Sequence, residues 1–507
     1  MNANFYALLE DKMRAAGDAP AFETSDGQIL SYAKLIEDVG RSAAALRSLG
    51  VAPGDRVMAQ VEKSIANVCL YLATLKIGAV FNPLNTAYTA AEIEYFISDA
   101  TPKVIVVSPE RQAEIETIIR ASKVRAVQTM GSNGAGTFTD LAATQGPAGE
   151  TVSRSADDLA ALIYTSGTTG RSKGAMITHG NITSNAQVLH AYWGFRPGDV
   201  LLHALPIFHV HGLFIALHTS LLNTSRILWM PKFELAEFMR LLPRATVVMG
   251  VPTFYTRLLA EPSFGIDQCR NLRLAISGSA PLLAETHRDF TARTGLEILE
   301  RYGMTEAGMI TSNPYKGGTR EPGTVGYPLP GVSVRIADAE GHALAAGEVG
   351  VLEVKGPNVF KGYWRNPEKT KEEFRTDGYF TTGDLATMAK DGRCTIVGRA
   401  KDLIITGGFN VYPKEIEGEL NSLPGIGESA VVGVPHPDFG EGIIAVITPV
   451  PGQTPPNEAD IIASLSKRLA KFKLPKRVFV AKDLPRNAMG KVQKNNLTAQ
   501  YRETFKG

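Results

Sequence analysis

The sequence predicts an α/β protein with a large N-terminal domain of several subdomains and a small α+β C-terminal domain. Up to about residue 320, short apolar runs alternate with helical segments, which is typical of parallel sheets covered by helices. From about Gly323 the chain changes to short β-type runs with frequent Gly and Pro. After Arg399 a new α+β pattern begins. We therefore expect domains at residues 1–399 and 400–507.

In the N-terminal part, segments of strand type alternate with segments of helical type. Residues 55–61, 79–84 and 103–107 form apolar runs of strand type, and residues 64–78 form a helical segment between the first two. The next helix, residues 89–100, opens with the capping box of Thr89 and Glu92. Later runs (ALIYTS, VLLHALP, RILWMP, TVVMGVP, LRLAISG) end in Gly, Pro, Ser or Thr. Such strand ends are where open α/β sheets place ligands.

The β-rich part contains SVRIAD (333–338) and GVLEVKG (350–356), and the C-terminal pattern runs from DLIITGG (402–408) to KRVFVAKDLP (476–485). Within the latter, residues 412–423 and 461–472 are helical in pattern. Residues 201–222 are apolar enough to suggest a membrane span, but Pro206 and four histidines interrupt them. We interpret this stretch as a buried strand and helix beside a site.

The composition is that of a globular protein whose partners are small molecules. Hydrophobic residues make up 44% and charged residues 21% of 507, and the net charge of +2 gives no reason to expect nucleic acid or an anionic membrane as partner. Cys69, Cys269 and Cys394 are far apart and form no CxxC pair, so neither disulfides nor a zinc site are indicated. The acidic N-terminus lacks a signal-peptide core. These features predict a cytoplasmic location.

Residues 164–174 read YTSGTTGRSKG, directly after an apolar run. Glycines let backbone amides approach an anion, the hydroxyls add donors and Lys173 adds a charge, so a polyphosphate is the expected ligand. The alternative is a flexible linker, which would gain nothing from a lysine and an arginine. A Walker A loop needs Gly-Lys followed by Ser or Thr, whereas here Lys173 precedes Gly174. The loop therefore indicates an ATP site of another kind.

Five segments together resemble the adenylate-forming superfamily of acyl-CoA synthetases, carrier-protein adenylation domains and luciferases. They are YTSGTTGRSKG (164–174), ERYGMTEAG (300–308), YFTTGD (379–384), GRAKDLIITGGFNVYPKEIE (398–417) and PRNAMGK (485–491). One alone is weak evidence, but all five occur in the family's order over nearly the whole chain. The resemblance implies a β-barrel-like part in the N-terminal domain, a mobile C-terminal domain, and ATP, Mg²⁺ and coenzyme A as ligands.

The resemblance also implies how the nucleotide binds. The loop would hold the β and γ phosphates, Tyr302 would stack on adenine with residues 278–281 as the opposite wall, and Asp384 with Arg399 would bind the ribose. A carboxylate meeting a triphosphate needs cations and preorganised donors of this kind. The implied nucleotide-binding residues are Thr165, Ser166, Gly167, Thr168, Thr169, Gly170, Lys173, Gly278, Ala280, Pro281, Tyr302, Gly303, Asp384 and Arg399.

Lys491, Thr305 and Glu306 are the implied catalytic residues. Lys491 would bridge the substrate carboxylate and the α phosphate, Thr305 would donate to a phosphate oxygen, and Glu306 would hold Mg²⁺. Taken without the resemblance, Thr305 and Glu306 are the N-cap and first-turn acid of a helix. On the same reading, Asp384 bonds its own backbone in a turn, and Lys491 is a solvated charge.

A hinge is implied at Asp402. In the family the C-terminal domain swings about this position after the adenylate forms, which withdraws the lysine and opens a tunnel for the pantetheine arm of coenzyme A. Gly407 and Gly408 fit a backbone that the thiol arm passes closely. A tight turn between two strands is an equally open explanation of the two glycines.

The acyl pocket is expected around GVPTFYTRLL (250–259), a helix beginning at Pro252. Arg257 shares a sector of this helix with Phe254 and Leu258, so we expect it at the inner edge of the pocket. The alternative is an arginine that snorkels from the edge of that face. The segment resembles the malonyl-CoA synthetases, in which an arginine here receives the distal carboxylate of a dicarboxylic acid.

The same resemblance assigns further pocket residues. A serine matching Ser279 would help to hold the distal carboxylate, and His209 of FHVHG (208–212) and Met304 would line the pocket. A metal site made by His209 and His211 would lack a third ligand at a telling spacing.

We therefore interpret the protein as an ATP-dependent CoA ligase for malonate, with methylmalonate as a further substrate. Alternatives are a ligase for oxalate, acetate or propionate, a carrier-protein loading enzyme, a non-catalytic nucleotide-binding relative and a luciferase-type oxygenase. Lys491 and Glu306 are both present, which disfavours the non-catalytic relative. The resemblance also implies acetylation of Lys491 by a lysine acetyltransferase and its reversal by a deacetylase.

Overall fold

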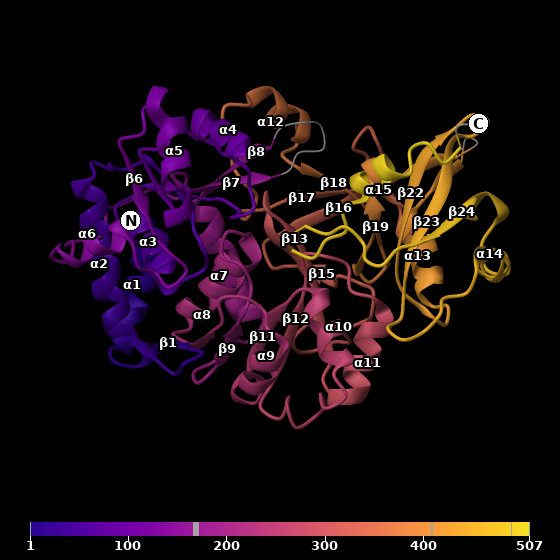
Figure 1. The fold of residues 1–507 in the computed structure, drawn as a ribbon, viewed down its shortest axis with the longest axis horizontal. Helices are drawn as coiled ribbons and strands as arrows, with labels where there is room; N and C mark the ends of the chain where they lie inside the picture. Colours follow the sequence, from indigo (N-terminus) through magenta and orange to yellow (C-terminus); the bar gives the residue numbers. More distant parts are fainter. Residues whose placement is uncertain (1, 166–171, 407–408, 488, 506–507) are drawn as a thin grey trace.

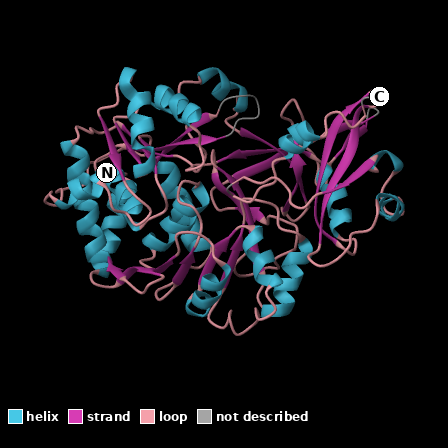
Figure 2. Cartoon of the chain, viewed as in Figure 1, coloured by secondary structure: helices cyan, strands magenta, loops and turns pink. Residues whose placement is uncertain are grey.

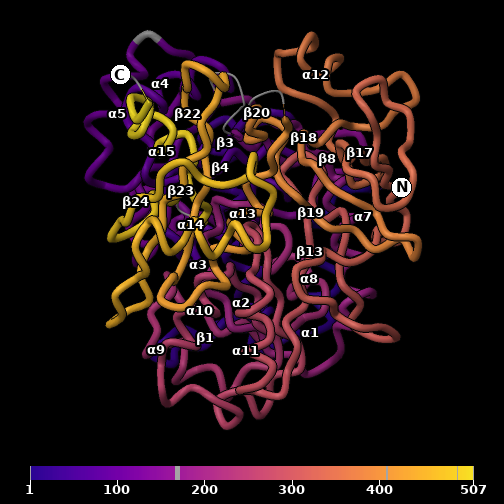
Figure 3. The backbone as a smooth tube through the Cα atoms, turned by 90° about the vertical axis from the view of Figure 1, so that its right-hand side faces the viewer, coloured from indigo at the N-terminus to yellow at the C-terminus, as the bar shows by residue number. Residues whose placement is uncertain are grey.

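The computed structural model describes residues 2–165, 172–406, 409–487 and 489–505. Two large sheets with their helices form the left and lower parts of the molecule in Figure 1, and two smaller sheets lie to the right. Helices surround the large sheets, whereas strands and loops dominate the right-hand side (Figure 2). The C-terminal part lies in front when the molecule is turned by 90° (Figure 3).

The six-stranded sheet has the order β6-β5-β3-β4-β7-β8 and is parallel except for β7 with β8. All four residues of β5 are buried, as expected for a strand with helices on both faces. The capping box of Thr89 and Glu92 is confirmed. The strands are β3 (Arg56–Gln60), β4 (Val80–Pro83), β5 (Val104–Val107), β6 (Ala126–Thr129), β7 (Leu159–Thr165) and β8 (Lys173–Thr178). The helices before, between and after these strands are α2 (Tyr32–Ser48), α3 (Ile65–Lys76), α4 (Ala90–Ala100), η1 (Pro109–Arg111), α5 (Gln112–Ile118), η2 (Ile119–Ala121), α6 (Thr137–Ala143) and α7 (His179–Tyr192).

The nine-stranded sheet has the order β15-β14-β13-β12-β11-β9-β10-β1-β2, parallel in its centre and antiparallel at both edges. One apolar core runs through both large sheets. The strands are β1 (Pro20–Thr24), β2 (Ile29–Ser31), β9 (Val200–His203), β10 (Arg226–Trp229), β11 (Val247–Gly250), β12 (Leu274–Ser277), β13 (Ile298–Met304), β14 (Gly308–Ser312) and β15 (Tyr327–Pro328); the helices are α1 (Phe5–Ala16), η3 (His211–Leu217), α8 (His218–Leu222), α9 (Leu235–Leu241), η4 (Leu242–Arg244), α10 (Pro252–Ala260) and α11 (Ala284–Thr294).

The apolar stretch at residues 201–222 is strand β9, then the π-helix η3, then α8, and most of it is buried. This confirms the expectation of a buried strand and helix. Within the described chain, no helix combines the length and the apolar character needed to cross a membrane.

The β-rich part is an antiparallel sheet in the order β16-β17-β18-β19. A single bridge between Gly326, which precedes β15, and Cys394 of β19 links it to the nine-stranded sheet. It begins where the sequence changes texture after Gly323. Its elements are β16 (Ser333–Ala337), β17 (Gly350–Lys355), α12 (Pro367–Glu373), β18 (Phe380–Met388) and β19 (Cys394–Arg399).

The C-terminal sheet has the order β21-β20-β23-β22, with β24 paired to β23, and encloses two apolar clusters of its own. The predicted helix at 461–472 ends at Leu465, after which the chain turns. The domain boundary at residue 399 remains a prediction. The elements are η5 (Ala400–Asp402), β20 (Ile404–Thr406), β21 (Phe409–Val411), α13 (Pro413–Asn421), β22 (Ile426–His436), β23 (Gly440–Pro449), α14 (Glu458–Leu465), η6 (Lys471–Lys473), β24 (Arg477–Val480) and α15 (Lys494–Gln500).

Candidate active site

Glu306 lies in a tight turn between the antiparallel strands β13 and β14. The alternative that Thr305 and Glu306 begin a helix is therefore wrong. The Glu306 side chain is 6% exposed, and its Oε1 accepts hydrogen bonds from Thr165 Oγ1 and Tyr363 Oη, each at 3.2 Å. Burial raises the pKa of this carboxyl. A buried carboxylate beside Thr165, near the start of the glycine-rich segment 164–174, fits Mg²⁺, which binds to one or two carboxylates and to substrate phosphates.

Lys173 begins β8, and its ammonium is held close to α12. Nζ lies 3.9 Å from Oε1 of Glu373 and 4.9 Å from the ring centroid of Tyr363. The Tyr363 hydroxyl lies between Glu306 and Glu373, so these four residues form one polar cluster. Sequence reasoning missed Tyr363 and Glu373, because they stand outside the five quoted motifs.

Tyr302, Asp384 and Arg399 come together from β13, β18 and β19. Tyr302 Oη donates to Asp384 Oδ2 at 2.6 Å, and Arg399 Nε lies 2.9 Å from Asp384 Oδ1. Asp384 is 4% exposed and belongs to a strand, so the turn alternative is wrong. Gly383 has a φ of 72°, a left-handed conformation that glycine adopts without strain, next to a register shift between β17 and β18. This local irregularity aims the Asp384 carboxylate at Tyr302 and Arg399.

Lys491 is brought to this cluster by a loop of the C-terminal part. The loop closes on itself through hydrogen bonds between Asn487 and Lys491 at 3.0 Å. Met489 packs into the main N-terminal core, and Gly490 lies against Thr253 of α10. In Figure 1 a loop in the C-terminal yellow reaches the centre of the molecule near β13.

The surroundings of Lys491 are those of a site. Burial, with the charge of Arg399, lowers the pKa of Lys491 to about 8, and the carboxylates of Asp384 and Asp402 act in the opposite direction. The alternative of a fully solvated lysine is therefore wrong. Asp402, the predicted hinge, ends the short helix η5 directly after β19.

His209, His211 and Ser279 form a second polar group near the start of the π-helix. His211 Nδ1 lies 3.1 Å from Ser279 Oγ, and the His211 N–H donates to His209 Nδ1 at 3.3 Å. Burial, with the charge of Arg301, lowers the pKa of His209 to about 4 and that of His211 well below its ordinary value. Ser279 has a φ of 70°, which is unusual for a residue with a side chain. Both imidazoles are thus neutral near pH 7.

Arg301 is a buried cation that sequence reasoning missed. It is 4% exposed, and in the described part of the chain its Nε and Nη2 have no hydrogen-bond partner. Burial lowers its pKa to about 9, so it stays protonated near pH 7. Its guanidinium lies so close to Gly278 that a Cβ there would overlap it. A buried unpaired guanidinium is costly, which indicates that an anion completes this site.

Arg257 is placed differently from the prediction. Phe254 and Leu258 are buried on α10, but Arg257 is exposed, and its guanidinium lies 5.9 Å from the ring centroid of Phe233. The expected desolvation of Arg257 at the inner edge of a pocket is therefore wrong in this structure. The helical sector that it shares with Phe254 reaches solvent there, so its long side chain extends over an aromatic ring.

The remaining predicted residues fall into two groups. Ala280, Pro281, Gly303 and Met304 lie in the segments after β12 and at the end of β13, beside Gly278 and Tyr302. Ser166, Gly167, Thr168, Thr169, Gly170, Gly407 and Gly408 lie outside the described residues.

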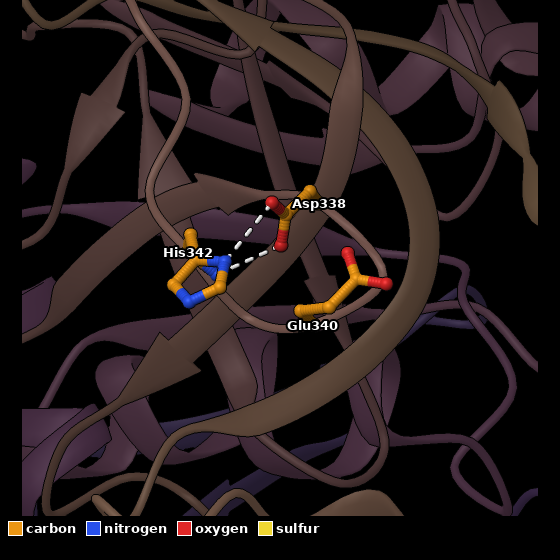
Figure 4. Close-up of side chains that lie close together, drawn as sticks. All are labelled: Asp338, Glu340 and His342. Atoms are coloured by element: carbon orange, nitrogen blue, oxygen red, sulfur yellow. Dashed lines mark hydrogen bonds and ion pairs between the residues drawn. The ribbon is translucent and has the colours of Figure 1, made fainter.

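Among the described residues, one group of three side chains could hold a metal ion, and none of the three is a predicted site residue. Asp338, Glu340 and His342 occupy an exposed turn after β16 (Figure 4). His342 Nδ1 lies 3.2 Å from Asp338 Oδ2, and the His342 N–H donates to Asp338 Oδ1 at 2.8 Å. These bonds within the turn explain its geometry without an ion.

Comparison with known proteins shows the family of the chain. The family described as AMP-binding enzyme matches residues 9–364, and AMP-binding enzyme C-terminal domain matches residues 415–491. ATP-bound MatB from Rhodopseudomonas palustris is 53% identical over 100% of both chains, with a TM-score of 0.96, and apo MatB gives 0.85. A feruloyl-CoA synthase of Amycolatopsis is 36% identical over 94% of both chains. A malonate–CoA ligase of Arabidopsis thaliana is 34% identical over 96% of this chain and 86% of its own.

Proposed function

Because the chain belongs to the AMP-binding enzyme family, we propose that it is an ATP-dependent, AMP-forming malonate–CoA ligase. It forms malonyl adenylate and pyrophosphate, and then transfers the malonyl group to coenzyme A with release of AMP. The malonate ligases and MatB among its relatives support this choice. The observation that carries it is the buried guanidinium of Arg301 without a carboxylate partner among the described residues.

In the first step the proximal carboxylate of malonate attacks the α phosphorus of ATP. Lys491 stands beside Asp384 and Arg399 and meets the negative charge that grows between carboxylate and phosphate. Lys173 leaves Glu373 to meet the outgoing phosphates. Glu306 would hold Mg²⁺, which neutralises charge on the phosphate oxygens. Tyr302, Asp384 and Arg399 would fix adenine and ribose, so the reacting atoms meet in line.

In the second step the C-terminal part turns about Asp402 and withdraws Lys491. The thiol of coenzyme A then attacks the carbonyl carbon of the adenylate and AMP leaves; the role expected of Gly407 and Gly408, which lie outside the described residues, stays a prediction. Met489 packs in the N-terminal core, and Lys414 Nζ of α13 donates to the carbonyl oxygen of Ile396 in β19, so the turn must break contacts at both places.

Arg301 supplies the substrate specificity in this proposal. Its planar guanidinium matches a carboxylate in two hydrogen bonds. Ser279 and His209 border the same site. A monocarboxylate leaves Arg301 unpaired, which disfavours its binding. Methylmalonate has the same two carboxylates and is the expected second substrate.

A panel of acids tests this assignment. We expect CoA-dependent AMP release with malonate and methylmalonate, and kcat/KM values about 10²–10⁴ lower for acetate, propionate and ferulate. In Arg301→Leu the preference for malonate over propionate should fall by at least tenfold, while the KM for ATP changes little. Equal kcat/KM for malonate and propionate in the wild type would exclude the proposed substrate.

Two further points belong to the proposal. Acetylation of Lys491 by a lysine acetyltransferase would remove its charge and stop adenylation. We also propose a cytoplasmic location, which the three free, buried cysteines Cys69, Cys269 and Cys394 support.

A further inference from the structure

Lys63 is a buried lysine that none of the reaction steps above uses. It follows β3 and precedes Ser64, the N-cap of α3, and it is 7% exposed. Its Nζ donates to the carbonyl oxygens of His203 at 2.9 Å and Met230 at 2.6 Å. It also lies 2.9 Å from His203 Nδ1 and 4.1 Å from the ring centroid of Trp229. Lys63 therefore connects the six-stranded sheet to the ends of β9 and β10 in the nine-stranded sheet.

The hydrogen bonds of His203 define which nitrogen carries its proton. His203 Nε2 lies 3.0 Å from the carbonyl oxygen of Gly212, which can only accept, so Nε2 carries the proton. Nδ1 is then the acceptor for an N–H of Lys63, whose own pKa burial lowers well below its ordinary value. Burial, with the charge of Lys63, lowers the pKa of His203 well below its ordinary value, which is consistent with this single neutral form.

The chain of contacts continues from His203 to the acyl side of the site. Gly212 lies in the first turn of the π-helix, where a Cβ would overlap the carbonyl of Pro206. Its neighbour His211 contacts Ser279, and His209 contacts the backbone of His211. The carbonyl that His203 holds is thus part of the backbone that carries both pocket imidazoles.

We propose that Lys63 is a positioning residue for the acyl pocket. By fixing His203 it holds the Gly212 carbonyl, and so sets where His209 and His211 stand against the distal carboxylate of the substrate. The inference rests on the proposed function for the identity of that substrate. A methionine would fill a similar volume without buried N–H groups, so the cost of burying the Lys63 amine is explained by the geometry that its hydrogen bonds impose.

The test compares Lys63→Met with Lys76→Met. Lys76 is the last residue of α3, the helix that Lys63 precedes; it is 2% exposed and pairs with Glu10 at 3.1 Å, at the opposite end of the helix from Lys63. In Lys63→Met we expect at least a tenfold rise in KM for malonate and a tenfold fall in the malonate-to-propionate ratio of kcat/KM, with KM for ATP within twofold. Lys76→Met should lower Tm and leave all three values within twofold.

Two variants of His203 test the contact between His203 and the Gly212 carbonyl, which connects Lys63 to the pocket. They decide whether the inference holds if Lys63→Met does not fold. His203→Gln keeps an amide N–H for Gly212 and should retain most of the selectivity, whereas His203→Phe removes that donor and should lose it. Wild-type values in Lys63→Met, or wild-type selectivity in His203→Phe, would overturn the inference while malonate turnover by the wild type still supported the proposed function. If the wild type prefers another acid, the proposed function fails. The KM and the selectivity of the Lys63 and His203 variants are then measured for that acid, and they decide whether Lys63 positions the acyl pocket.

Discussion

At the scale of single residues, the proposed chemistry depends on three cationic side chains, those of Lys491, Arg301 and Lys173, which would bind anionic substrates. Arg301 has no carboxylate partner among the described residues, whereas Lys173 lies 3.9 Å from Glu373 and Lys491 lies near Asp384 and Asp402. In the proposed function, malonate supplies the anion for Arg301, and the phosphates of ATP meet the two lysines. Removal of one cation should therefore affect one substrate or one step rather than all of them.

Lys491→Ala should lower acyl-adenylate formation by about 10²–10³-fold, because the ammonium stabilises charge that develops in the first step. Thioester formation from supplied malonyl adenylate should be close to wild type. The two measurements are malonate-dependent pyrophosphate exchange and thioester formation from synthetic adenylate. Pyrophosphate exchange at the wild-type rate would show that Lys491 has another role.

The same residue predicts a pH dependence. Because the pKa of Lys491 is about 8 in the free protein, it loses its required proton as the pH rises through that value. The kcat/KM for adenylation should therefore fall above about pH 8. Bound phosphates favour the charged form, so kcat should persist to higher pH. In Lys491→Arg the fall of kcat/KM at alkaline pH should move beyond pH 10. A fall at the same pH as in the wild type would show that another group titrates there.

Gly278→Ala tests the position of Arg301. The added Cβ would overlap the guanidinium and force it to move. The ratio of kcat/KM for malonate over propionate should fall at least tenfold. Gly418→Ala is the matched control, since nothing lies within 4 Å of a Cβ there and the residue is in helix α13. If Gly278→Ala keeps its malonate preference, Arg301 does not bind the distal carboxylate.

At the scale of elements, the short helix η5 is the expected pivot. Asp402→Pro should allow adenylation within about tenfold of wild type but slow coenzyme A transfer by a larger factor, because proline fixes φ near −65° and the hinge must change its dihedrals. The separate rates of the two half-reactions give the answer. Equal losses in both half-reactions would remove Asp402 from the hinge.

Elements also show where sequence reasoning succeeded and where it failed. Strands of the two large sheets, the capping box at Thr89 and the helix starting at Pro252 follow from local pattern and are confirmed. The turn at Thr305 was open to a helical reading because Thr followed by Glu also suits an N-cap. There the pairing of β13 with β14 overrides local preference. The π-helix η3 had no signal in the apolar pattern.

At the scale of the whole molecule, the motifs indicated which residues would be near one another but not which would be buried. Tyr302, Asp384, Arg399 and Lys491 lie far apart in sequence and meet in the structure. Arg301 stood in a quoted motif but was passed over, because its burial results from packing against Gly278 on another strand end. Arg257 was expected inside because helical periodicity does not reveal where a face meets solvent.

Within the proposed function, the arrangement of the C-terminal part corresponds to the adenylate-forming step. Met489 packs in the N-terminal core, Lys491 lies beside Asp384, and the whole chain superposes better on the ATP-bound relative than on its apo form. We therefore assign this arrangement to the proposed first half-reaction, and coenzyme A transfer would require a second arrangement.

The central claim, that malonate is the acid activated, is tested most directly by competition. The wild-type enzyme with ATP, Mg²⁺ and coenzyme A is given an equimolar mixture of malonate, acetate, propionate and ferulate, and the thioesters are quantified by mass spectrometry at low conversion. Their ratios equal the ratios of kcat/KM. Malonyl-CoA should exceed each of the other thioesters by at least about 100-fold. A mixture dominated by a monocarboxylate thioester would contradict the account.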